Sequence, residues 1–400
     1  MARAKSALKH WSLPVLAAIG VSVVGLALKS ACAPWSWGGA AETYTRLCYS
    51  DLGPLYWVRG LASGVLPYFE SFEGSFIEYP VLTGMWMWLI ARITELVVGV
   101  PSVDTFVALT WATSVVFIAF TVALMARHST GNRRAAWWFA FSPALLLVLG
   151  INWDALAVLC AVAALIFYQR NKLGFVGVAI GVGAAAKLFP ALLLVPLIAH
   201  LLTHRKFKAG LRESVQLAAL AFATWLMINL PFILFAREGW LEFYRFSRVR
   251  GIDFGSLPLG LNYVFGITVT TEFANTVGLI AVGVTSVLLL IFAKRLNIYQ
   301  SAFAIVSVFV LVNKVYSPQF WLWMTALLVM TGISRRAFIF WNIAEAIYFV
   351  GIWRFLLFTQ DPSASGAIDY RTYGWIVLLH WLSTLTITVY ALSSQKVRNL

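Results

Sequence analysis

Charged residues are scarce in this 400-residue chain: Asp, Glu, Lys and Arg together make up 12% of it. Hydrophobic residues make up 61%, and the mean hydropathy is +0.82. A soluble globular protein is nearer half apolar and about a quarter charged. Too little polar side chain is therefore present to cover a water-soluble body, and the excess of apolar residues predicts a polytopic membrane protein.

Cysteine and acidic residues are also scarce. Three cysteines are too few for a disulfide-built scaffold. The 16 acidic residues stand against 30 basic ones, but the basic residues lie in short clusters between apolar stretches, which excludes a nucleic-acid-binding protein. The apolar runs are continuous over helix-spanning lengths and lack the alternation of a transmembrane β-barrel. The expected fold class is an all-α polytopic integral membrane protein.

The basic clusters serve as markers of topology, because short loops rich in Lys and Arg stay in the cytoplasm. The clusters are Arg3/Lys5/Lys9, Arg127/Arg133/Arg134, Arg170/Lys172, Arg205/Lys206/Lys208/Arg212, Lys294/Arg295, Arg335/Arg336 and Lys396/Arg398. Placing all of them inside predicts twelve spans with both termini in the cytoplasm. The predicted spans are residues 11–31, 104–126, 135–151, 154–168, 173–189, 190–203, 214–236, 273–293, 299–315, 318–333, 337–358 and 374–393. We expect the first span to be a retained helix and not a cleaved signal peptide.

Residues 79–100 (YPVLTGMWMWLIARITELVVGV) are apolar enough for a further span but do not fit this topology. Counting them as a crossing would place the basic clusters that follow on the outer side, and Arg92 and Glu95 interrupt the segment. We therefore predict a helix that enters the membrane from the outer face without crossing it. A true crossing, with the rest of the topology inverted, is the alternative.

Three hydrophilic stretches fall on the outer side: residues 32–78, 237–272 and 359–373. Their Gly, Pro and charged residues indicate loops, with short surface helices such as 54–66. Cys32 and Cys48 both lie in the first loop, where an oxidising compartment would allow a disulfide. No internal repeat is visible, and we expect residues 1–400 to form a single membrane-embedded domain.

Polar residues within or at the ends of membrane helices are costly, so they are candidates for function. Those that come out on the outer side are Asp51, Arg59, Glu78, Asp154, Lys187, Lys314 and Arg354. Carboxylates and cations gathered at one membrane surface suit a substrate with an anionic head group. Every histidine except His380 lies on or toward the cytoplasmic side, so an outward-facing general base would be Asp or Glu.

Each of these residues also has a purely structural explanation. Asp51 precedes Pro54 and could cap a helix, while Asn152 and Asp154 could cap the helix that follows them. The long cations could extend from the membrane to its surface without binding a substrate; these are Lys187, Lys314 and Arg354. Both explanations stay open at this level.

An ordered series of short motifs carries more information than any one residue. YSD at 49–51, RG at 59–60 and PY at 67–68 precede EYPVLTG (78–84), RRAAWWFAFSP (133–143), NWDALAV (152–158), AKLFPALLLVPL (186–197) and NKVYSPQFWLW (313–323). The series, over about residues 11–335, resembles the bacterial GT-C glycosyltransferases that use polyprenyl-phosphate sugars. Specifically, it resembles the polyprenol-phosphate-mannose-dependent α-(1→2)-mannosyltransferases of actinobacteria, to which the enzymes that extend phosphatidylinositol mannosides belong. The looser pattern RR, SP, N-x-D, K-x-x-P is also similar to that of the eukaryotic GPI mannosyltransferases.

The resemblance implies an all-helical GT-C-like body with a large outer loop after the first helix, and an essential acidic residue of that loop near the membrane surface. Asp51 occupies the matching position. The chain has one Asp there and no DxD motif, so the metal-binding version of the motif is absent. A lipid-phosphate sugar needs no metal to activate a diphosphate, and we expect metal-independent chemistry with no cofactor. The expected reaction moves a sugar, in this family mannose, to a lipid-linked or glycolipid acceptor by one inverting displacement.

Roles for the candidate residues follow from this reaction. The catalytic base is assigned to Asp51. Cations must hold the departing phosphate, and these are Lys314 and Arg59, with Lys187 and Arg354 behind them. Contacts to sugar or acceptor hydroxyls, or to these cations, are assigned to Glu78, Asp154, Tyr316 and Gln319. The site is expected on the outer side of the plasma membrane, on the face built by the three outer loops. The partners are the polyprenyl-phosphate sugar donor, the acceptor and membrane lipids.

Two other classes of protein share some of these features. A secondary transporter or lipid flippase would share the many spans, but it should show repeat symmetry and charges near the middle of the bilayer. A scaffolding protein would not need so many ionisable residues on one side. Within the enzyme hypothesis, arabinose and glucose stay open as the transferred sugar, and neither the acceptor nor the linkage follows from the residues.

Overall fold

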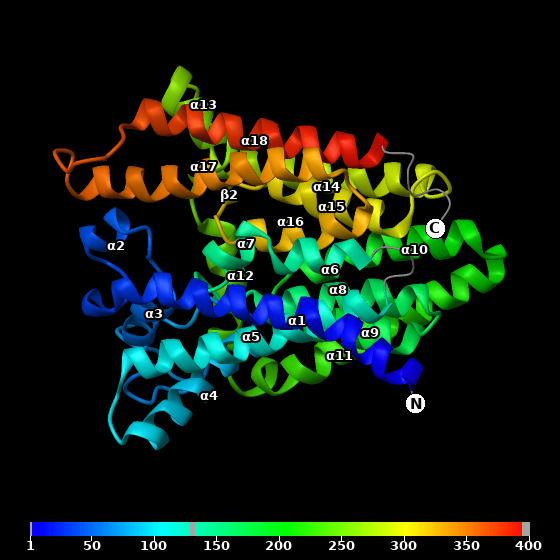
Figure 1. Cartoon of the computed structure of the whole chain (residues 1–400), viewed down its shortest axis with the longest axis horizontal. Helices are drawn as coiled ribbons and strands as arrows, with labels where there is room; N and C mark the ends of the chain where they lie inside the picture. Colours follow the sequence, from blue (N-terminus) through cyan, green and yellow to red (C-terminus); the bar gives the residue numbers. More distant parts are fainter. Residues whose placement is uncertain (1, 129–132, 394–400) are drawn as a thin grey trace.

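The computed structural model describes residues 2–128 and 133–393 and is almost entirely helical (Figure 1). The first half contains α1 (Ala2–Lys29), η1 (Ser30–Trp35), α2 (Ala41–Thr45), α3 (Leu52–Val58), α4 (Val81–Val98), α5 (Val103–His128), α6 (Arg133–Ala140), α7 (Pro143–Leu147), α8 (Ala155–Gln169), α9 (Leu173–Ala186), η2 (Phe189–Leu193) and α10 (Leu194–His204). The second half contains α11 (Phe207–Phe235), α12 (Arg237–Val249), β1 (Asp253–Phe254), α13 (Leu257–Phe265), α14 (Thr271–Phe292), α15 (Ile298–Val312), β2 (Val315–Tyr316), α16 (Phe320–Leu328), η3 (Val329–Thr331), α17 (Arg335–Gln360) and α18 (Tyr370–Ser393). The expected all-α class is therefore observed.

Seven helices in the described part of the chain are long and apolar enough to cross a membrane: α1, α4, α5, α11, α14, α17 and α18. Shorter apolar segments cover α8, α9, η2–α10, α15 and α16–η3. They match predicted spans whose lengths are near the minimum of about 17 residues for a helix that crosses a membrane. The fold is that of an all-helical protein suited to a membrane, and the count of twelve crossings stays a prediction.

One predicted span is divided into two separate α-helices, and the spans at 190–203 and 318–333 each combine an α-helix with a 3-10 helix. Residues 135–151 do not form a continuous helix, because the chain breaks between α6 and α7. The side chain of Ser142 accepts a hydrogen bond from the Leu145 amide, and Pro143 follows at the first helical position. A serine cap followed by Pro starts a new helix instead of continuing the old one. The apolar composition of this segment therefore did not reveal the break.

Helix α4 is the segment that did not fit the predicted topology. It is long enough to cross, and it packs against α5, α9 and α11. In Figure 1 it lies at the same end of the long axis as α2 and α3. The re-entrant placement of residues 79–100 stays a prediction.

Small residues bring the central helices close together. Helix α8 is buried along most of its length and packs between α5 and α9. On α9, a Cβ added at Gly181 would lie 2.6 Å from the Ala221 carbonyl oxygen of α11, and one at Gly183 would lie 2.8 Å from Pro190. Glycine at these positions permits close backbone approach, as is common where membrane helices associate. A Cβ at Gly183 would also lie 2.9 Å from the Cys160 Cβ of α8, so α8 and α9 pack closely, with Asp154 and Lys187 at their ends.

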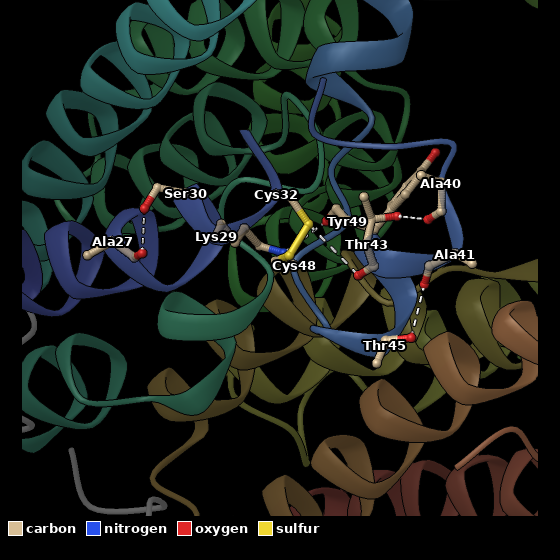
Figure 2. The surroundings of a disulfide bond; sticks show 10 residues. All are labelled: Ala27, Lys29, Ser30, Cys32, Ala40, Ala41, Thr43, Thr45, Cys48 and Tyr49. Carbon is tan, nitrogen blue, oxygen red and sulfur yellow. Dashed lines mark hydrogen bonds between the residues drawn. A yellow bond between two sulfur atoms is a disulfide. The ribbon is translucent and has the colours of Figure 1, made fainter. Parts of the chain in front are cut away.

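The stretches expected as outer loops contain more structure than predicted. Residues 32–78 include η1, α2 and α3, and a disulfide joins Cys32 to Cys48 (Figure 2). That bond confirms the predicted pairing. Residues 237–272 form α12, β1 and α13, and β1 pairs in parallel with β2, with Phe254 opposite Tyr316.

Candidate active site

Two loops distant in sequence are joined at the position of Asp51. The Asp51 amide donates to the Ile151 carbonyl at 2.9 Å, and the Ser50 hydroxyl donates to the Gly150 carbonyl at 2.6 Å. The Ser50 amide also donates to the Trp37 carbonyl at 2.8 Å. These bonds place the segment after α1 directly against the segment that leads into α8.

The Asp51 side chain faces the second loop and does not cap α3. Its position is that of the N-cap, yet it makes no side-chain capping bond. One carboxylate oxygen accepts from the Tyr49 hydroxyl at 3.0 Å, and the other accepts from the Asn152 amide at 2.8 Å. The capping explanation for Asp51 is therefore wrong in this structure.

Asp154 and Lys187 form the other half of the same network. The Lys187 Nζ lies 2.9 Å from the Asp154 Oδ1 and donates to the Asn152 Oδ1 at 3.0 Å. The Trp323 indole donates to Asp154 Oδ1 at 2.7 Å. Asp154 likewise sits at an N-cap position without capping. Lys187 is held in an ion pair, so the explanation of a cation that only reaches the membrane surface does not describe it.

Tyr79 completes what we call the Asp51 cluster, defined as Tyr49, Asp51, Tyr79, Asn152, Asp154 and Lys187. The Asn152 amide donates to the Tyr79 hydroxyl at 2.7 Å, and the Lys187 Nζ lies 5.5 Å from the centre of the Tyr79 ring. The start of α4 and the end of α9 are joined by Thr83, whose hydroxyl donates to the Ala186 carbonyl at 2.6 Å. Four separate segments of the chain therefore converge on one network.

The two carboxylates of the cluster have different environments. Asp154 is 1% exposed, whereas Asp51 is only half-buried. Burial raises the pKa of Asp51 above its ordinary value, because the charged form loses hydration; the bonds from Asn152 and Tyr49 and the charge of Lys187 oppose that shift. Burial likewise raises the pKa of Tyr49, so its hydroxyl keeps its proton and can donate to Asp51. A carboxylate with a raised pKa in a half-buried residue is suited to accept a proton.

Arg59 and Glu78 form an ion pair with each other and do not join the Asp51 cluster directly. The Arg59 guanidinium contacts both carboxylate oxygens of Glu78, at 2.6 and 3.0 Å. This pair raises the pKa of Arg59 above its ordinary value. Glu78 directly precedes Tyr79, so the pair borders the Asp51 cluster. The two residues were assigned separately to phosphate and sugar, and the structure holds them as one unit.

Lys314 lies in a second group, on the loop between α15 and β2. Its Nζ donates to the Arg248 carbonyl at 2.9 Å, and its own carbonyl accepts from the Asp253 amide at 2.9 Å. It is 6% exposed. These bonds connect Lys314 to α12 and β1; Arg248 lies in α12, and Arg250 follows its last residue.

Tyr316 and Gln319 follow Lys314 in the chain. The Tyr316 hydroxyl is buried against Glu345 and Thr384, at 3.3 and 3.1 Å, so it is engaged between α17 and α18. Gln319 is half-buried at the start of α16. The Tyr316 ring stacks near Phe320, and Phe320 stacks on Trp323, which bonds Asp154. The segment that follows Lys314 is thus linked to the Asp51 cluster by the neighbouring rings of Tyr316, Phe320 and Trp323.

Arg354 lies on α17 and follows Trp353, a residue that contacts the Asp51 cluster. Trp353 packs against the Tyr49 ring, with centres 5.1 Å apart. Arg354 itself lies beside Gly366 of the 359–373 loop, where a Cβ would come within 3.1 Å of its guanidinium. The side chain is half-buried and is not part of the Asp51 cluster.

Sequence reasoning missed Lys29, Tyr49 and Tyr79 as site residues. Lys29, at the end of α1, is 3% exposed, and its Nζ donates to the Tyr49 carbonyl at 3.0 Å (Figure 2). A buried lysine at the end of an apolar run was a signal for Lys29. Tyr49 and Tyr79 lie within the motifs YSD and EYPVLTG, but neither was singled out, because a tyrosine hydroxyl carries no charge that would mark it as costly near a membrane.

Within the described residues, no three His, Cys, Asp or Glu side chains lie close enough together to hold a metal ion. The Asp51 cluster instead offers a half-buried carboxylate, a buried ion pair and several hydroxyl and amide groups. Comparison of the chain with known protein-family models and with curated proteins finds no match.

Proposed function

We propose that this protein is a membrane glycosyltransferase. It moves a sugar, with mannose as the first candidate, from a polyprenyl-phosphate donor to a lipid-linked or glycolipid acceptor at the outer face of the plasma membrane. The motif series and the helical body support the class. The observation that carries the proposal is the Asp51 carboxylate, which is turned away from its helix cap and held by Tyr49 and Asn152 in the Asp51 cluster.

Asp51 supplies the base for an inverting displacement. The acceptor hydroxyl oxygen forms a bond to the anomeric carbon as the bond from that carbon to the phosphate oxygen breaks. The hydroxyl proton passes to Asp51, and polyprenyl phosphate leaves with the bonding electron pair. Such a step needs one base and no glycosyl-enzyme intermediate.

The other residues of the Asp51 cluster orient this base. Asn152 contacts both Asp51 and Lys187, so it couples the base to the Lys187–Asp154 ion pair. Asp154 is too buried to act on a substrate, and its bond from Trp323 fixes it in place. In this proposal Asp154 therefore acts by holding Lys187.

The departing phosphate needs cations close to the base. Lys187 is the cation within the cluster, and Arg59 pairs with Glu78, which directly precedes Tyr79 of the cluster. Lys314 and Arg354 lie on other elements, outside the Asp51 cluster. Arg59 keeps Glu78 as its partner in the free protein, so a phosphate would have to share the guanidinium with that carboxylate. Lys187 shares its charge with Asp154 in the same way, but we rank it first because it contacts Asn152, which holds Asp51. Arg59, Lys314 and Arg354 follow it, and we leave Tyr316 out because its hydroxyl is engaged between helices.

The test is a transfer assay on membranes that contain the full chain. Labelled polyprenyl-phosphate-mannose is incubated with candidate lipid acceptors, and the products are separated by thin-layer chromatography. Product formation that depends on Asp51 supports the proposal. If the labelled lipid moves intact between leaflets, and no polyprenyl-phosphate sugar gives its sugar to an acceptor, the protein would instead be identified as a flippase.

A further inference from the structure

A groove opens between α14, α15 and α18, away from the Asp51 cluster. Helix α15 packs against both α14 and α18 and forms its floor. The cavity has a volume of about 460 Å³. Its walls are largely apolar side chains, among them Leu288 and Phe292 of α14, Ala304 and Val308 of α15, and Leu392 of α18. A volume of this size lies in the usual range of small-molecule sites, about 300–1,000 Å³.

The polar residues of the wall already have partners within the protein. The Gln300 amide nitrogen donates to the Ala391 carbonyl at 2.8 Å, and its amide oxygen accepts from the Asn297 backbone at 3.0 Å. The Thr388 hydroxyl donates to the Thr384 carbonyl at 2.7 Å. With these groups satisfied internally, the interior of the groove suits a hydrocarbon chain.

One cation stands at the rim of the groove. Arg295, in the connection between α14 and α15, is exposed and lies over the Phe292 ring at 5.6 Å. None of the ion pairs in residues 2–128 and 133–393 involves Arg295. A guanidinium beside an apolar groove is complementary to an amphiphile with a negative head group.

The position of the groove separates it from the proposed catalytic site. Ser393, at the end of α18, lines it, and α18 ends on the side of the molecule where α1 begins (Figure 1). Helices α2 and α3, which flank Asp51, lie at the opposite end. The α10–α11 connection, at the same end as the groove, carries Arg205 and Lys206, and Lys208 lies in the first turn of α11. Clusters of basic residues at one membrane surface attract anionic lipids.

We infer that this groove binds a phospholipid with an anionic head group from the leaflet at this end of the molecule. One acyl chain lies between α14 and α18 on α15, and the phosphate is held by Arg295. The inference does not depend on the proposed glycosyltransferase activity.

Native mass spectrometry of the purified full chain in mild detergent provides the test. The probes are phosphatidylglycerol and phosphatidylcholine with identical acyl chains. We expect phosphatidylglycerol to bind more tightly, and Arg295→Gln to weaken its binding about ten- to hundredfold, since a charge-assisted bond is lost. Thr285→Phe, on the groove wall, should reduce binding of both lipids by filling the space. Lys294→Gln is the matched control, because Lys294 is adjacent and exposed but does not line the groove, and it should leave affinity within about twofold.

Three results would overturn the inference. They are equal binding of the two lipids by the unaltered chain, an Arg295→Gln variant that binds phosphatidylglycerol like the control, and displacement of phosphatidylglycerol by polyprenyl phosphate at a much lower concentration. The last result would assign the groove to the donor lipid. Because Arg295 is exposed, its substitution is not expected to prevent folding, and thermal unfolding of each variant checks this.

Discussion

Asp51 accepts hydrogen bonds from two donors and makes no capping bond, so a structural role as a helix cap does not compete with the proposed role as a base. Asn can replace the oxygen that Asp51 offers to Asn152, but it cannot accept a proton. We expect Asp51→Asn to reduce transfer about 10²–10⁴-fold, the range for loss of a general base. Initial rates in membrane preparations, normalised to expression, measure this.

The matched control for that substitution is Asp369→Asn. Asp369 is exposed and accepts a bond from the Thr372 amide before α18, an interaction that Asn retains. Its variant should keep near-normal transfer. Normal transfer in Asp51→Asn as well would move the base elsewhere, with Glu78 the next candidate.

The pH dependence of kcat/KM is an independent test of Asp51 as the base. Its pKa is raised above the ordinary value of 3.8, chiefly by burial. We therefore expect kcat/KM to fall on the acid side at a pH above that value, as the base becomes protonated. In the Asp51→Asn variant the residual activity should lack this limb.

The same shift predicts the sign of the effect on stability. The folded protein binds the Asp51 proton more tightly than the unfolded chain does, so the associated stability is present at low pH and is lost as pH rises through the folded pKa. At neutral pH, Asp51→Asn should consequently unfold at a temperature no lower than that of the unaltered chain. A clear loss of stability would indicate a structural role for the charge.

At the residue scale, sequence reasoning identified some site members and missed others for a physical reason. Asp51, Asp154 and Lys187 stood out because ionised groups near a membrane are costly, and the structure brings all three into one network. Tyr49 and Tyr79 join the same network through hydroxyl groups whose burial cost is small. Only the packing of four chain segments shows that these hydroxyls are involved.

At the element scale, the disulfide holds the segment that carries Asp51, the proposed base. Cys48 lies three residues before Asp51, and its bond to Cys32 connects that segment to the end of α1 (Figure 2). We expect the double variant Cys32→Ser/Cys48→Ser to lose about 2–4 kcal/mol of stability, as for a short closed loop. Thermal unfolding in detergent measures the loss, and dithiothreitol should reproduce it in the unaltered chain.

Cys160 provides the control for the disulfide. It is a free buried cysteine on α8, so Cys160→Ala should leave the response to dithiothreitol unchanged. An unaltered chain that is insensitive to reductant, with both cysteines fully alkylated before reduction, would contradict the disulfide.

Helices α17 and α18 are joined by a buried polar group that sequence reasoning did not identify. Glu345 is 1% exposed and accepts from Tyr316 and Thr384, and His380 Nδ1 lies 3.1 Å from its carboxylate. Removing the carboxylate leaves its partners unsatisfied, so we expect Glu345→Ala to cost about 3–5 kcal/mol, and the closer mimic Glu345→Gln less. Thermal unfolding of both variants should be compared with that of Glu272→Gln on the exposed start of α14. Equal stability of Glu345→Ala and the control would show that the group does not hold the helices.

Apolar runs predicted most long helices because length and composition are local properties. They failed at α6 and α7, where a Ser–Pro cap interrupts an apolar stretch. They also failed in residues 237–272, where α12 is amphipathic and β1 depends on pairing with β2, far along the chain. Boundaries and pairings that depend on tertiary contacts were therefore not predictable from local composition.

At the scale of the whole molecule, the positions of the helix ends can be compared with the predicted topology. Helix α1 begins and α18 ends at one end of the long axis, while α2 and α3 lie at the other (Figure 1). This arrangement agrees with an even number of crossings, in which the termini share a side. It does not by itself say which side faces the cytoplasm, and the Lys and Arg clusters supply that part of the prediction.

Labelling of single cysteines in intact cells tests this orientation. In a Cys160→Ala background that keeps the disulfide, Cys is introduced at Glu42 or Glu238 for the outer side, and at Lys208 for the cytoplasmic side; all three positions are exposed. An impermeant maleimide should modify the first two in intact cells and the third only after the membrane is opened, because the basic α10–α11 connection is retained inside. Labelling after permeabilisation is the control for reactivity. Modification of Lys208→Cys in intact cells would invert the topology, and the Asp51 cluster would then face the cytoplasm, where a disulfide between Cys32 and Cys48 would not persist.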